Sequence, residues 1–194
     1  MSKTPKYIDA FQKLTRRDAT IDDLSRMELE FYGESPRSVI LLSAMLTELG
    51  LEVALRKTLR EGKETDALFA IDRGPIGTFA AKAKLAFALG LFEAITHHDL
   101  KLIRTLRNGF AHSSIPITFD APEVAAVCQQ LKLPDLPLSK VPEAYVRRSS
   151  KGEANDISHP KTRYVTSCNV IAVELFTFGR PREGMRALTP PLLP

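Results

Sequence analysis

The class of fold is decided by residues 35–60, which read SPRSVILLSAMLTELGLEVALRKTLR. Ser35 is a preferred N-cap residue, and Pro36 suits the first helical position, where its missing N–H costs nothing. The residues that follow repeat with the helical period and make one broad apolar face, formed by Val39, Leu42, Met45, Leu46, Leu49, Val53 and Leu59. We therefore expect one long helix up to about Arg60, or a shorter one if Gly50 kinks or ends it.

The same helical period returns along most of the chain. Capping patterns and apolar faces predict further helices over about 20–31, 79–89, 96–112, 120–131 and 160–178. The alanine-rich helix 79–89 is apolar on several sides, so we expect it to be the central one. Thr96 to Asp99 resembles a capping box for the helix that follows, and Ser158 is the expected cap of the last helix. The pattern predicts an all-α protein.

One segment has a different character. Residues 132–158 contain Pro134, Pro137 and Pro142, which break regular structure, so we expect one long irregular excursion there. Residues 180–194 are rich in proline and are expected to fray. The predicted organisation is a single-domain helical bundle over 1–194, with a core of about 20–131 and a C-terminal helix over about 160–178.

The composition limits which cellular compartment and which kinds of partner we expect. The chain has 194 residues, 44% hydrophobic and 26% charged, with a net charge of +4, which permits an anionic partner without requiring one. Cys128 and Cys168 have no metal-binding spacing, so we expect no zinc site and a reducing cytoplasm. The start of the chain shows no signal peptide, and no stretch reaches the roughly 18 apolar residues of a membrane span. We expect a cytoplasmic protein that needs no cofactor.

The element Arg107-Asn108-Gly109-Phe110-Ala111-His112 carries the candidate chemistry. An arginine can hold a phosphate, and a histidine can take a proton near neutral pH, which is the minimum for cutting RNA without a metal. Five residues along a continuous helix separate two side chains by about 140°. They would share a site only if the helix unwinds near Gly109 or if a second chain contributes. The alternative is structural: Arg107 pairs with an acid, and His112 caps the helix end.

Other motifs give weaker signals. Arg147, Arg148 and Lys151 lie in a basic loop that, with Lys161 and Arg163, could contact the phosphates of RNA or DNA. Tyr145 and Tyr164 could stack on bases. Such a run of charges is usually just a solvated loop. No helix-turn-helix or other motif for reading bases is visible. His97-His98-Asp99 lacks the third and fourth ligands of a metal site. The turn Gly74-Pro75-Ile76-Gly77 is more simply a tight turn than a phosphate loop.

Residues 74–112 resemble the mannitol operon repressor (MltR) family of bacteria. The resemblance rests on three pieces in the same order: the turn at 74–77, the apolar helix segment 84–91, and the segment 102–107 followed by His112. It implies an all-helical fold, a cytoplasmic location and a role in repressing the uptake of sugar alcohols. The family is understood to lack a recognisable DNA-binding motif, so the resemblance implies a regulator that acts through a protein partner at least as readily as by contact with DNA. We expect a homodimer.

The same element also resembles the signature of HEPN-type helical domains, many of which are ribonucleases. By residue match, Arg107 and His112 would be the catalytic pair, with Asn108 as the polar residue after the arginine. The sequence therefore leaves two hypotheses. The first is a transcriptional regulator working through protein contacts, and the alternative is a metal-independent RNA endonuclease that uses Arg107 and His112.

Overall fold

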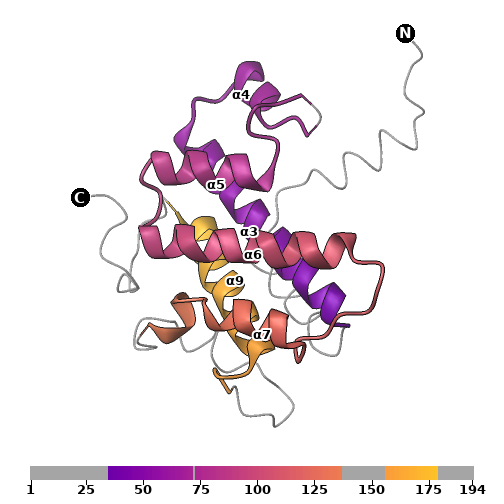
Figure 1. Cartoon of the computed structure of the whole chain (residues 1–194). Coiled ribbons are helices and arrows are strands. Elements are labelled where there is room, and N and C mark those ends of the chain that lie inside the picture. Colours follow the sequence, from indigo (N-terminus) through magenta and orange to yellow (C-terminus); the bar gives the residue numbers. More distant parts are fainter. Residues whose placement is uncertain (1–34, 72, 137–155, 179–194) are drawn as a thin grey trace.

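The computed structural model describes residues 35–71, 73–136 and 156–178, and all regular structure within them is helical (Figure 1). The elements are α3 Pro36–Thr58, α4 Lys63–Leu68, α5 Phe79–Ala88, α6 Ala94–His112, α7 Pro122–Gln129, the short 3-10 helix η1 Leu133–Asp135, and α9 Pro160–Thr177. The expected all-α class is confirmed. The helix expected over 20–31, the basic residues Arg147, Arg148 and Lys151, and the tail 180–194 lie outside the described residues.

The pair α3 and α9 forms the centre of the described structure. The two helices pack along each other, and α5 and α6 lie side by side across α3, while α7 and η1 pack against α9 (Figure 1). Gly50 lies at the crossing of α3 and α9, where an added Cβ would come within 3.2 Å of the Leu175 Cβ. A glycine here therefore lets the two helices approach closely.

The expected long helix is confirmed, and it does not end at Gly50. The Ser35 side chain accepts a hydrogen bond from the Ser38 N–H at 3.2 Å, and Pro36 takes the first turn. By length and composition α3 is also apolar enough to cross a membrane, but more than half of its most apolar stretch is buried inside the protein, as in the core helix of a soluble protein.

Three expectations were wrong in detail. Helix 79–89 is not central: α5 packs against α3 and α6 and leaves Phe87 and Leu89 exposed. The helix expected from residue 96 begins at Ala94 after the N-cap Glu93, so Thr96 is a buried residue inside α6 and not its cap. The last helix is capped by His159, whose Nδ1 accepts from the Lys161 N–H, and not by Ser158.

Two short elements, α4 and the 3-10 helix η1, were not expected from the sequence. α4 follows Gly62, which has a φ of 149° and gives no side-chain cap, so neither apolar period nor capping pattern marks it. Beyond α4, the turn at 74–77 is tight, as expected. A Cβ on Gly74 would lie 2.2 Å from the Leu68 carbonyl oxygen, and one on Gly77 would lie 2.4 Å from the Ala70 carbonyl oxygen.

Candidate functional site

The candidate catalytic residues lie on the last turns of α6. Arg107 and Asn108 are half-buried, and the guanidinium of Arg107 donates to the Asn108 side-chain oxygen at 3.0 Å. His112 is exposed and is the last residue of the helix. The structure thus joins Arg107 to Asn108 and leaves His112 apart from both.

The helix is continuous through Gly109. The Ser113 N–H donates to the Gly109 carbonyl at 3.0 Å, and a Cβ added to Gly109 would meet nothing within 4 Å. Because the turn is not unwound, the five-residue spacing still separates Arg107 and His112 by about 140° around the axis. A single chain therefore does not bring the pair onto one face, and shared chemistry would need a second chain.

The end of α6 is held by the first turn of α3. Arg37 donates to the carbonyl oxygens of Ser113 at 2.8 Å and Ile115 at 3.1 Å, so the segment after His112 is tied to α3. The structural alternative is not confirmed in either of its two contacts. The partner of Arg107 is an amide and not an acid, and the helix is closed by the Ser113 backbone and not by the His112 ring.

A buried carboxylate lies on the first turns of the same helix. Asp99 is fully buried and accepts hydrogen bonds from the N–H groups of Lys132 and Leu133 at 2.9 Å and from the Ser167 hydroxyl at 2.7 Å. The His98 Nδ1 lies 3.1 Å from the Asp99 Oδ1. Through these hydrogen bonds Asp99 joins α6 to the 132–133 backbone and to α9. No group of three metal-binding side chains occurs in the described part of the chain.

Arg163 makes a second polar link, from α9 to α7 and η1. It is 5% exposed and donates to both carboxylate oxygens of Asp135, at 2.7 and 2.8 Å, and to the carbonyls of Cys128 and Leu131. The hydrogen bond to Asp135 raises the pKa of Arg163, and the same bond lowers the pKa of Asp135. The idea that Arg163 belongs to a solvated basic loop is therefore wrong, because its guanidinium is used inside the fold.

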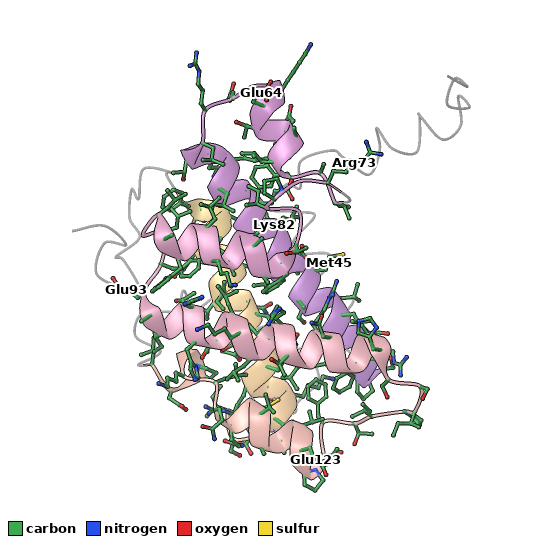
Figure 2. The ribbon with its side chains drawn as sticks, turned by 45° about the horizontal axis from the view of Figure 1, so that its top comes forward. Met45, Glu64, Arg73, Lys82, Glu93 and Glu123 are labelled. Carbon is green, nitrogen blue, oxygen red and sulfur yellow. The ribbon has the colours of Figure 1, made fainter. Side chains whose placement is uncertain are left out.

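A third polar cluster joins α3 to α5. Lys82, which Figure 2 labels, is buried. Its ammonium lies 3.1 Å from a carboxylate oxygen of Glu48 and 2.9 Å from one of Glu52. Glu52 also accepts from Arg56 at 2.9 Å, and Arg56 lies 4.1 Å above the centre of the Phe69 ring. Burial acts to raise the pKa of Glu52, but the hydrogen bonds from Lys82 and Arg56 outweigh it and lower that pKa.

Sequence reasoning missed these three polar clusters for one reason. Each contains hydrogen bonds or ion pairs between residues that are 28 or more positions apart in the chain. The usable signal was a charged residue on the apolar side of a helix. Asp99 falls between the buried Thr96 and Ile103, and Lys82 falls between the buried Phe79 and Ala83.

Comparison with known proteins shows which solved structure has a similar fold. No protein-family model matches the chain, and no curated protein matches it. A solved structure does match: the X-ray structure of the MtlR–HPr complex from Escherichia coli, with a TM-score of 0.58 and 18% sequence identity. The likeness covers 78% of this chain and 97% of that chain. This chain is thus an all-helical protein with an MtlR-like fold. The resemblance to the mannitol operon repressor is supported at the level of fold.

Proposed function

We propose that this chain is a bacterial regulatory protein of the mannitol-repressor type that acts by contact with a protein partner. The observation that carries the proposal is the likeness in fold to MtlR, which was crystallised in complex with HPr, over nearly the whole of that chain. In the proposal the chain is a single domain, cytoplasmic and homodimeric, and it acts on transcription through its partner.

An apolar strip on α3 supports a protein contact. Met45 is 45% exposed, and Leu42, Leu49 and Val53 are only partly buried beside a small apolar cluster that is separate from the main core. Figure 2 marks Met45 on α3. An exposed apolar side chain with apolar neighbours is the usual anchor of a protein interface, because its burial on binding removes apolar surface from water.

The test is a calorimetric titration of the purified chain with HPr from the same bacterium. We expect saturable binding with a Kd of about 1–10 µM, in the range of a transient regulatory contact. Met45→Glu should weaken that binding if the partner covers the α3 strip, whereas Ile71→Glu, which changes a side chain that is already 84% exposed, serves as the matched control. Absence of binding at about 100 µM HPr would contradict the proposal for this partner.

The ribonuclease alternative keeps Arg107, Asn108 and His112 as its candidate residues. It would need two chains that bring Arg107 of one to His112 of the other, since the α6 helix is unbroken between them. It predicts cleavage of RNA in EDTA with 2′,3′-cyclic phosphate ends, and loss of cleavage in His112→Ala with an unchanged melting temperature. RNA left intact by the purified dimer would exclude it.

A further inference from the structure

The outer face of the α5–α6 pair is basic. Lys84 on α5 and Lys101 and Arg104 on α6 are exposed, and the last two lie three residues apart on one side of the helix. The single acid within α6 is Asp99, which is fully buried and hydrogen-bonded on the inner side. Glu93, which Figure 2 labels, is the N-cap residue that precedes α6. Neither α5 nor α6 therefore carries an exposed acid within its own residues.

An aromatic pair lies beside these cations. The rings of Phe87 on α5 and His97 on α6 are stacked, with centroids 4.3 Å apart and planes inclined by 18°, and Phe87 is 39% exposed. The pKa of His97 is lowered by burial and then by the charges of Lys101 and Lys84. Lys84 lies three residues before Phe87 on α5, and Lys101 lies four residues after His97 on α6, so each lysine neighbours one ring of the pair on the surface of its helix.

These cations differ from several other basic side chains of the fold. Lys82 on α5, Arg56 on α3 and Arg163 on α9 all form ion pairs within the fold. Among the described residues, no carboxylate lies within ion-pair distance of Lys84, Lys101 or Arg104. All three side chains are exposed, so within the described ranges their positive charges are available to an anion from another molecule.

We propose that the α5–α6 face, defined by Lys84, Phe87, His97, Lys101 and Arg104, binds single-stranded nucleic acid. Lys84, Lys101 and Arg104 contact backbone phosphates, and the outer side of the stacked Phe87–His97 pair receives a base. Exposed aromatic rings among cations are the composition that single-strand-binding surfaces use, because every base has a face that can stack.

The composition favours a single strand over a duplex and over a protein. A base inside a duplex is already stacked on its neighbours and cannot lie on Phe87 without being unpaired. Protein interfaces deplete lysine at their centre and surround a larger apolar core. Here the exposed apolar side chains are Phe87 and Leu89, with two lysines and an arginine beside them.

The experiment is fluorescence anisotropy on the full chain in EDTA, with labelled probes of about 20 nucleotides: an unstructured RNA, the DNA of the same sequence, and that DNA as a duplex. We expect both single strands to bind more tightly than the duplex. Three phosphate contacts predict a slope of about −2 for log K against log salt concentration, since each contact on a single strand contributes about −0.7.

Two double variants test whether binding depends on this face or only on the net charge of the chain. Lys101→Glu with Arg104→Glu should weaken single-strand binding about tenfold or more at low salt, because two contacts become repulsions. Arg60→Glu with Lys63→Glu makes the same change in net charge at the far end of the molecule, around α4, and should change the Kd by less than about twofold (Figure 1). Phe87→Ala should weaken binding about fivefold or more while the salt slope stays the same.

Several results would overturn the proposal. These are no binding of either single strand at about 100 µM protein, tighter binding of the duplex, or equal weakening by the two double variants. Loss of HPr binding in the Lys101 and Arg104 double variant, with RNA binding intact, would make the face a protein site instead. Melting temperatures check folding, and Lys84→Glu serves as the second variant if the double variant unfolds. HPr binding is measured separately, so failure of the proposed function and failure of this inference can be distinguished.

Discussion

The polar residues buried at the junction of α6, η1 and α9 set how these elements meet. Asp99 and Arg163 come from different helices, and both bond to the backbone around residues 128–133. A buried charged group is tolerated only when hydrogen bonds satisfy it, so these two residues fix the path of the chain between α7 and η1. The sequence could suggest that Asp99 is unusual, but not that its partners lie 33 to 68 residues further on.

The first prediction concerns Asp99→Ala. The change leaves the N–H groups of Lys132 and Leu133 and the Ser167 hydroxyl without their acceptor in a buried position. We expect the free energy of unfolding to fall by about 3 kcal/mol, measured by urea denaturation. Asp120→Ala, at a largely exposed carboxylate, is the matched control and should change it by less than about 0.5 kcal/mol. Equal effects of the two substitutions would show that the Asp99 contacts contribute little.

The second prediction concerns the two buried thiols. Burial raises the pKa of Cys128 to about 11 and that of Cys168 to about 12. Since the folded state holds these protons more tightly than the unfolded state, the stabilisation is complete below about pH 8.5 and is lost as the pH rises towards 11 and 12. At pH 8 neither thiol should react with Ellman's reagent faster than the protein unfolds, whereas both should react at once in urea. Rapid reaction of the native protein would contradict the burial of the thiols.

At the scale of the element, the helices with apolar faces could be predicted from the sequence, and α4 could not. The period of Leu100, Ile103, Leu106 and Phe110 gave the buried face of α6 correctly, because burial of apolar surface is what holds such a helix in place. α4 has no buried residue in its six positions, so there was no such pattern to find. Capping was less predictable: Thr96 has the residue type of a cap but is buried within the helix.

Two glycines in helices give the third prediction, because their surroundings differ. A Cβ on Gly109 meets open space, so Gly109→Ala should stabilise the protein by up to about 1 kcal/mol through helix propensity. A Cβ on Gly50 comes within 3.2 Å of Leu175, so Gly50→Ala should gain less than that, and Gly50→Val should destabilise the protein. Thermal unfolding of the three variants tests the close crossing of α3 and α9, and a gain for Gly50→Val would contradict it.

At the scale of the whole molecule, the all-α class and the order of turn and helices over 74–112 could be predicted from the sequence. The geometry of the candidate site at Arg107 and His112 could be predicted from the sequence only in part. The five-residue spacing between Arg107 and His112 already implied divergence on a helix, and the unbroken turn at Gly109 agrees with it. The stacked pair of Phe87 and His97 could not be read from the sequence, because it depends on how α5 and α6 pair across the turn at 89–93.

The measurement that tests the central claim most directly is sedimentation velocity of the chain with fluorescently labelled HPr from the same bacterium. We predict that HPr shifts to a faster-sedimenting species in the presence of the chain, and that the chain alone sediments as a dimer of about 43 kDa, twice the 21.5 kDa of one chain. HPr that sediments alone at every concentration of the chain would contradict a regulator acting through this protein contact.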